Sequence, residues 1–327
     1  MAIHMFQQLI DTLKKSPKRI VFTEGTDARI LEASARLLAG TFLTPILIGN
    51  VDAVHAAAEE AGFNIRGAEI IDPETYPDMD KMVDTMVELR KGKMTADECR
   101  AALKKGNYFG TMLVKMGVAD CLLGGATYST ADTVRPALQL VKTKPGNKIV
   151  SSCFIMVREG VGDNTVLAMG DCAINIKPTE DELVEITTEV AHCARIFGID
   201  PKVAMLSYST KGSGKGEDVD KMRNAYEKVL ATNPDFDVDG ELQFDAAVSP
   251  KVGQLKSPGS PVAGYANTFI FPDINAGNIG YKIAQRLGNF DAYGPILLGL
   301  NAPINDLSRG CNAQEVYSMA IITAALA

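Results

Sequence analysis

The feature that most constrains the fold is an alternation of short apolar runs with helical patterns. Strand-like runs rich in β-branched residues occupy 19–23, 45–49, 69–72 and 119–125. Helical patterns lie between them, at 28–38, 51–61 and about 78–91, 95–105 and 107–116. Strands that alternate with helices in this way form a parallel sheet covered by helices. The sequence therefore predicts an α/β fold.

The alternation is interrupted once, by the Pro- and Gly-containing loop 142–147. The next two strand-like runs, 148–158 and 165–169, are joined by a short Gly-rich loop and predict a hairpin. Further strands are expected at 203–207, 244–247, 268–271 and 295–300, and helices after Thr179, at about 218–231, at 275–287 and from Ala313. We therefore expect two α/β domains that meet near residue 145.

Length and charge narrow the possible functions. A chain of 327 residues is too long for one small core and suits two domains. A net charge of −7 and a pI near 5.2 disfavour a nucleic-acid partner. No apolar run approaches the roughly 18 residues of a membrane span. Six scattered cysteines without a CxxC pair are expected to be reduced, in the cytoplasm. The three histidines match no ligand spacing, so no metal is expected.

The segment Asn305–Cys311, followed by Glu315, concentrates reactive groups. The guanidinium of Arg309 is shaped to bind a phosphate, and the hydroxyl of Ser308 could steady developing charge. Glu315 could accept a proton, although Asn312 and Glu315 also fit the two ends of a helix capping box. Cys311 could be a nucleophile, but a buried structural thiol is favoured. This segment predicts chemistry on a phosphorylated small molecule.

Loops that follow strands are the expected binding elements, since two-domain α/β proteins bind ligands at the carboxyl ends of their strands. Four such loops contain polar or glycine residues: 24–29, 124–135, 273–278 and 301–315. In the loop 124–135, Ser129 or Thr130 could start a helix whose N-terminus binds an anion near Arg135. Alternatively, either residue could be a plain N-cap, with Arg135 solvated. Both interpretations stay open. The loop 211–216 lacks the Walker A spacing, and a mobile surface loop is favoured.

Three segments, 129–139, 269–282 and 305–311, resemble the phosphate acetyl/butyryltransferase family, and the similarity covers nearly the whole chain. The resemblance implies reversible acetyl transfer between CoA and phosphate, without a metal or prosthetic group. It implies two Rossmann-like three-layer domains with mostly parallel sheets around a cleft, similar to the isocitrate/isopropylmalate dehydrogenase-like fold. The expected domains are 1–145 with 304–327, and 146–303. A homodimer is also expected.

The same resemblance assigns roles to individual residues. Ser308 would stabilise the transition state, Arg309 would bind phosphate and polarise the acyl carbonyl, and Glu315 occupies the position of a base that is usually Asp. The CoA or substrate would contact Arg90, which by default is a helix-terminal charge facing water. The other expected substrate-binding residues are Ser129, Thr130, Arg135 and Asn278. Direct attack of the CoA thiolate, without an acyl-enzyme, is the expected mechanism.

Three alternatives remain at this point. A butyryltransferase or other short-chain acyltransferase would use the same residues. A two-domain nicotinamide-dependent hydroxy-acid dehydrogenase would need a cluster of Asp residues for a divalent metal, and none is evident in the sequence. A non-catalytic module that senses acyl-CoA is disfavoured by the Ser308–Arg309 pair.

Overall fold

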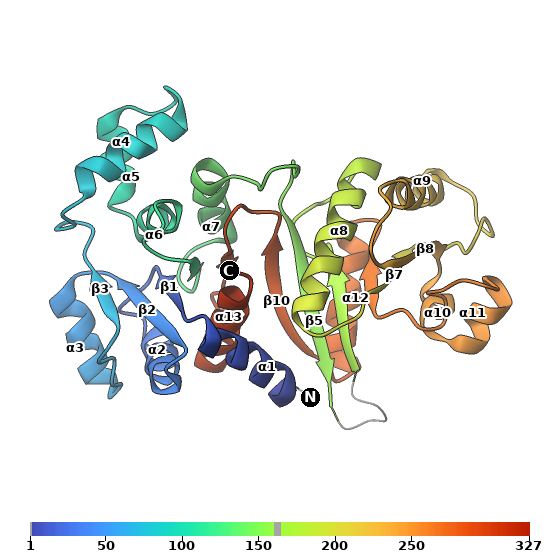
Figure 1. The fold of residues 1–327 in the computed structure, drawn as a ribbon, viewed down its shortest axis with the longest axis horizontal. Helices are drawn as coiled ribbons and strands as arrows, with labels where there is room; N and C mark the ends of the chain where they lie inside the picture. Colours follow the sequence, from blue (N-terminus) through green and yellow to red (C-terminus); the bar gives the residue numbers. More distant parts are fainter. Residues whose placement is uncertain (1, 160–164) are drawn as a thin grey trace. The chain divides into compact units, whose positions relative to one another are not determined.

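The computed structural model describes residues 2–159 and 165–327, and it separates into two compact units (Figure 1). One unit contains residues 6–145 and 300–327. The other contains residues 146–299, and the first residues of the chain are assigned to it. The expected domain limits differ from this division at 300–303 and at the start of the chain. The α/β class is confirmed, and each unit is built around its own sheet.

The sheet of the first unit is entirely parallel, with the strand order β11-β4-β1-β2-β3. Its strands are β1 (Lys18–Phe22), β2 (Leu43–Ile48), β3 (Glu69–Ile71), β4 (Cys121–Gly124) and β11 (Ile304–Asp306). All four residues of β4 are buried, as expected for a strand covered on both faces. The chain runs outward from β1 to β3 and then returns to the other side of β1. The strand order therefore reverses between β1 and β4, the position where open α/β sheets bind ligands.

The helices of this unit lie before, between and after these strands in the chain. They are α1 (Ala2–Lys15), α2 (Ala28–Gly40), α3 (Val51–Ala61), α4 (Met79–Arg90), α5 (Ala96–Leu103), α6 (Gly106–Lys115), α7 (Thr130–Pro136), the π-helix η1 (Ala137–Val141) and α13 (Ala313–Ala325). Helix α13 packs on α2 and on β4, whereas α6 packs on β1 and β4. Crossovers between parallel strands are right-handed. The connection from β3 back to β4 crosses the sheet in the opposite direction to the connection from β1 to β2, so α6 lies on the face opposite α2. A Cβ at Gly110 of α6 would lie 2.9 Å from Val21 Cγ1, so glycine permits this close approach.

The final strand of the first sheet corrects one sequence expectation. The sequence placed the Asn305–Cys311 segment after a strand at 295–300. That strand is β10 (Asp291–Leu298) and belongs to the other sheet, whereas the segment begins inside β11, where Ile304 pairs with Leu122. Three residues, two of them polar, carry too little apolar pattern to identify a strand. The polar side chains are satisfied internally, since Asn305 Nδ2 donates to Thr323 Oγ1 at 2.9 Å.

The second unit has a mixed six-stranded sheet with the order β10-β5-β6-β9-β7-β8. Its other strands are β5 (Ser151–Arg158), β6 (Thr165–Gly170), β7 (Lys202–Leu206), β8 (Asp237–Leu242) and β9 (Thr268–Ile270). Its helices are α8 (Glu180–Ile196), α9 (Glu217–Ala231), α10 (Phe244–Val248), α11 (Pro250–Lys256) and α12 (Ile274–Leu287). The predicted hairpin is confirmed as the antiparallel pair β5–β6. Part of its connecting loop, 160–164, lies outside the described residues.

One expectation for the second unit is wrong. Residues 244–247 form helix α10, not a strand, and the strand is the preceding β8. Two acidic residues of β8, Asp239 and Glu241, are buried, which hides the strand from an apolar pattern. They also contact the first two residues of the loop 211–216. Glu241 Oε1 accepts from the backbone N–H of Gly212 at 2.7 Å, and Lys211 Nζ forms an ion pair with Asp239.

Local helix signals are confirmed where the sequence placed them. Capping boxes are formed at the starts of α5, α8 and α13, by Thr95 with Glu98, Thr179 with Glu182, and Asn312 with Glu315. All six cysteines are free and buried. Over the described ranges, none of the helices combines the length and the apolar character needed to cross a membrane.

Candidate active site

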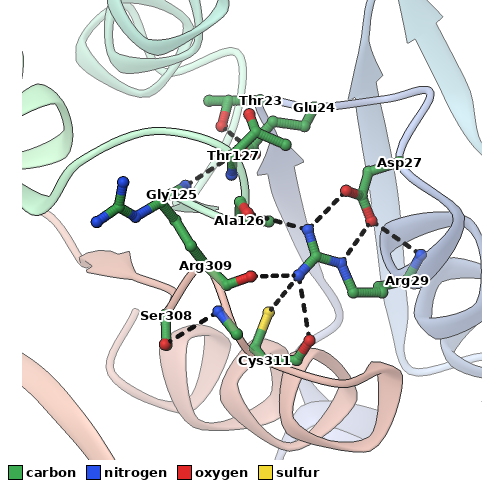
Figure 2. A network of polar contacts seen from close by, with 11 residues as sticks. Thr23, Glu24, Asp27, Arg29, Gly125, Ala126, Thr127, Ser308, Arg309 and Cys311 are labelled. Atoms are coloured by element: carbon green, nitrogen blue, oxygen red, sulfur yellow. Dashed lines mark hydrogen bonds and ion pairs between the residues drawn. The ribbon is translucent and has the colours of Figure 1, made fainter.

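Three loops meet at the carboxyl edge of the first sheet (Figure 2). They follow β1, β4 and β11, which are parallel neighbours, so their ends lie side by side. Glycines allow the loops to approach closely. A Cβ at Gly124 would collide with the hydroxyls of Thr23 and Tyr128, and Gly125 has a positive φ of 98° where a side chain would collide with Asp306. The sequence thus permits a tight junction at the point where the strand order reverses.

The loop after β11 presents Ser308 and Arg309 at the surface. The backbone N–H of Cys311 donates to the carbonyl oxygen of Ser308 at 2.9 Å, and the N–H of Gly310 donates to Ser308 Oγ at 3.2 Å. Within the described parts of the chain, no acceptor takes the hydroxyl proton of Ser308. That hydroxyl is therefore able to donate to a bound ligand.

The two ends of Arg309 have different environments. Its carbonyl oxygen accepts from Arg29 Nη1 at 2.8 Å, while its side chain extends away from Arg29 (Figure 2). Its guanidinium is exposed and contacts no acidic partner among the residues that the structure describes. An arginine fork that is free of internal partners suits the bidentate binding of phosphate.

Glu315 lies in the first turn of α13 and forms the expected capping box. Its Oε2 accepts from the backbone N–H of Asn312 at 3.0 Å, and its own N–H donates to Asn312 Oδ1 at 2.9 Å. Its Oε1 accepts from none of the described donors, and the side chain is exposed. One carboxylate oxygen therefore fixes the side chain while the other remains available to a ligand.

Cys311 lies beside these residues but is not an activated nucleophile. It is buried, and burial raises the pKa of its thiol, an effect that the neighbouring Arg29 only partly opposes. A raised pKa reduces the thiolate population at neutral pH. The structural role favoured from the sequence fits this environment.

The loop after β4 contains Ser129 and Thr130, whose hydroxyls have internal partners. Ser129 stands at the N-cap position of α7 but makes no side-chain cap; its Oγ donates to Asp132 Oδ2 at 2.7 Å. Thr130 Oγ1 donates to Asp306 Oδ2 at 2.6 Å. Burial raises the pKa of Asp306, although its hydrogen bonds from Thr130 and Thr133 oppose the shift. These contacts tie the start of α7 to the end of β11.

The remaining predicted residues are more widely placed. Arg135 is exposed in the last turn of α7, without a polar partner in the described structure. Arg90 ends α4 and is half-buried, and its Nε is buried with no hydrogen-bond partner among the described atoms. Arg90 is therefore not the fully solvated terminal charge that was its default interpretation. Asn278 lies in the other unit, on α12, where its Nδ2 donates to the carbonyl oxygen of Cys172 at 3.1 Å.

The loop after β1 contributes residues to which the sequence gave no role. Glu24 Oε1 accepts from the backbone N–H groups of Gly125 and Thr127 at 3.0 and 3.2 Å, and Oε2 accepts from Thr23 Oγ1 at 2.7 Å. Burial raises the pKa of Glu24, and these hydrogen bonds lower it. Asp27 and Arg29 form a second set of contacts. Only the position of this loop after a strand indicated that it belongs to the site.

The described residues contain no group of three or more His, Cys, Asp or Glu side chains that could hold a metal ion. What the first unit does provide is a hydroxyl, an unpartnered guanidinium and a carboxylate at the switch point of a parallel α/β sheet. This combination of fold and side chains is typical of proteins that bind a small anionic ligand at the carboxyl edge of the sheet.

Comparison with known proteins specifies the family. Residues 4–324 match the family model described as phosphate acetyl/butaryl transferase. The phosphate acetyltransferase of Bacillus subtilis is 51% identical over 99% of both chains. A phosphotransacetylase structure from Streptococcus pyogenes has a TM-score of 0.95 and 54% identity, covering 98% of this chain and 97% of its own. The EutD phosphotransacetylase from Staphylococcus aureus has a TM-score of 0.94 and 47% identity, covering 99% and 98%. The chain belongs to the phosphate acetyl/butyryltransferase family.

Proposed function

We propose that this enzyme transfers an acetyl group reversibly between CoA and inorganic phosphate, and that Ser308, Arg309 and Glu315 perform the transfer. The family supports the reaction. The single observation that supports the site is the exposed guanidinium of Arg309, which has no acidic partner among the described residues and lies in the same loop as the Ser308 hydroxyl. A phosphoryl group needs a donor fork of this kind.

In the direction of thioester synthesis, the sulfur of CoA attacks the carbonyl carbon of acetyl phosphate. The new C–S bond forms, the bond from that carbon to the phosphate oxygen breaks, and inorganic phosphate leaves. Arg309 binds the phosphoryl oxygens, and Ser308 donates to the carbonyl oxygen as its negative charge grows. Holding both substrates at one site supplies the proximity contribution. No acyl-enzyme forms.

Glu315 is the proposed base for the thiol proton. A free thiol has a pKa of about 8.5 and a free glutamate about 4.3. Complete transfer of the thiol proton to a carboxylate before the sulfur attacks is therefore unfavourable. Proton transfer therefore accompanies formation of the C–S bond, when the proton becomes more acidic. The capping contact leaves Oε1 available for this task, and it holds the longer Glu side chain in the place of the usual Asp.

The phosphates of CoA are the proposed ligands of Arg90 and Arg135. A chain with a net charge of −7 needs local positive groups to hold such an anion. Arg90 is half-buried and forms no ion pair with a described residue, so its charge is available to a phosphate. Ser129, Thr130 and Asn278 are proposed as further CoA or substrate contacts, in addition to their internal hydrogen bonds. CoA is a substrate in this scheme, and no prosthetic group takes part.

Replacing Arg135 with alanine should raise the KM for CoA about 10-fold or more, because a hydrogen bond to a charged group contributes roughly 1.5–3 kcal/mol. Initial rates measured against CoA at saturating acetyl phosphate test this. Arg66→Ala, at another exposed arginine of the same unit, is the matched control. An unchanged KM in Arg135→Ala would contradict the assignment.

A direct assay tests the proposed reaction. Purified protein is mixed with acetyl phosphate and CoA, without metal or nicotinamide, and thioester formation is followed by ultraviolet absorbance. We expect a steady increase, and a slower one with butyryl phosphate. A flat trace with acetyl phosphate would exclude the proposed function, and a faster rate with butyryl phosphate would reassign the acyl group.

We further propose that the enzyme is a cytoplasmic homodimer whose interface includes α12. The free, buried cysteines support a reducing compartment. Helix α12 leaves Ile279, Ile283 and Leu287 exposed by 58%, 54% and 81%. Their four-residue spacing places them on one helix face, and apolar patches of this kind mark interaction surfaces. Ile176, exposed by 68%, adjoins the start of this helix, where its carbonyl oxygen accepts from Ile274.

Ile283→Glu should convert a dimer to a monomer, because a charge cannot be buried in this apolar surface without a partner. Light scattering coupled to size-exclusion chromatography measures the mass. Leu230→Glu, at a partly exposed residue of α9, should leave the mass unchanged. A dimer of unaltered mass in Ile283→Glu would rule out α12 as the interface.

A further inference from the structure

We propose that Arg29 is the positioning residue of the site: its guanidinium holds the backbone of Arg309 and Cys311 so that Ser308 and Arg309 face the substrate. This inference rests on the proposed function. Arg29 lies in the first turn of α2, far from these residues in sequence, and its side chain reaches all three loops at the sheet edge (Figure 2).

Every N–H of the Arg29 guanidinium has an acceptor. Nε and Nη2 donate to the two carboxylate oxygens of Asp27, at 2.9 and 2.7 Å, as a bidentate pair. Nη2 also donates to the carbonyl oxygen of Ala126 at 2.9 Å. Nη1 donates to the carbonyl oxygens of Arg309 and Cys311 at 2.8 and 3.1 Å. The five donors of an arginine are thereby used, and none is left for a substrate.

The charge of Arg29 is also compensated. Hydrogen bonds from Arg29 lower the pKa of the Asp27 carboxyl, so the pair is ionised at neutral pH. Asp27 is the N-cap of α2, where its Oδ1 accepts from the backbone N–H of Arg29 at 2.9 Å. The guanidinium is therefore fixed to the N-terminal end of α2. Its contribution is geometric, not the attraction of an anion.

The two carbonyls that Arg29 holds lie on either side of Gly310. Glycine accepts many backbone conformations, so an unsupported loop of this sequence would sample several orientations of the peptide planes. Hydrogen bonds from one rigid guanidinium to the carbonyl oxygens of residues 309 and 311 select one of these orientations. In that orientation the side chain of Arg309 extends to the opposite side from Arg29. A displacement of about 1 Å at a reacting group can cost roughly 100-fold in rate.

The test compares Arg29→Lys and Arg29→Gln with Arg36→Gln. Arg36 is also on α2 and also contacts α13, through Gln314 Oε1 at 2.6 Å and the ring of Tyr317 at 4.1 Å, but it does not touch the loop carbonyls. Both Arg29 variants should lose about 10- to 100-fold in kcat with the KM for CoA little changed, because a lysine keeps the charge but cannot span the acceptors. Arg36→Gln should keep wild-type kcat. Wild-type kcat in Arg29→Lys, or an equal loss in Arg36→Gln, would overturn the proposal.

A second readout does not depend on catalysis. Cys311 is 6% exposed, and its Sγ lies 3.7 Å from Arg29 Nη1. Loss of the guanidinium should raise the rate of Cys311 labelling by a thiol reagent about 10-fold, through local opening of the loop. The contribution of Cys311 is obtained by subtracting the labelling of the same variant with Cys311→Ala added. Circular dichroism verifies that each variant is folded. If the wild type transfers no acetyl group, the proposed function fails while labelling still tests the position of the loop. Unchanged labelling in Arg29→Gln would refute the role of Arg29 even in an active enzyme.

Discussion

Arg309→Ala should lower kcat by about 100-fold or more, since it removes a charge-assisted contact to the group that gains charge in the transition state. The guanidinium is exposed and has no described partner, so its loss leaves no buried group unsatisfied. The fold should therefore keep its stability while the reaction slows. Initial rates of thioester formation, together with the thermal unfolding midpoint, measure the two effects separately.

Arg309→Lys refines this test. Lysine keeps the positive charge but offers a point charge instead of a planar fork, so we expect only partial recovery of kcat. Arg66→Ala, at an exposed arginine outside the three loops, should behave as the wild type. Turnover at the wild-type rate in Arg309→Ala would remove Arg309 from the mechanism.

Glu315→Gln should also reduce kcat by roughly 100-fold or more, because an amide cannot accept the thiol proton. Glutamine serves in capping boxes as glutamate does, so α13 should begin at the same residue and the unfolding midpoint should change little. Glu315→Asp keeps the carboxylate and should keep most of the activity. Steady-state kinetics of the two variants separate the loss of the base from the loss of the cap.

Glu98→Gln is a matched control for the Glu315 experiment. Glu98 occupies the same position in the capping box of α5, where its Oε2 accepts from the backbone N–H of Thr95 at 2.8 Å. The substitution alters a cap of the same kind in a helix without proposed catalytic residues. An equal loss of kcat in Glu98→Gln, or full activity in Glu315→Gln, would refute the assignment of Glu315 as base.

The sequence was informative wherever structure depends on neighbours along the chain. The β1–α2–β2 alternation and the three capping boxes are local patterns, and all are present. The strands that the sequence missed, β8 and β11, contain buried acidic or amide side chains. Those side chains are stabilised by partners in other segments, as Glu241 is by Ser209, which lies 32 residues earlier in the chain.

The same distinction applies to the site. Ser308, Arg309 and Glu315 could be predicted together because they lie within eight residues of one another. The role of Arg29 could not, since its contact with Arg309 joins positions 280 residues apart. The hydrogen bond from Thr130 to Asp306 is likewise distant in sequence and occupies a hydroxyl that had been assigned to the substrate. Pairings of this kind depend on the order of strands in the sheet.

The position of β11 has a consequence for how the protein is made. A ribosome synthesises β1 to β4 early, but the strand that pairs with β4 and precedes the proposed catalytic loop is encoded after the entire 146–299 unit. Until residues 304–306 arrive, one edge of β4 has no partner, and such an edge is prone to pair with other chains. The proposed site is therefore incomplete until residues 304–315 have been synthesised. A chain interrupted before residue 300 would lack the residues of the proposed site and would leave this edge of β4 open.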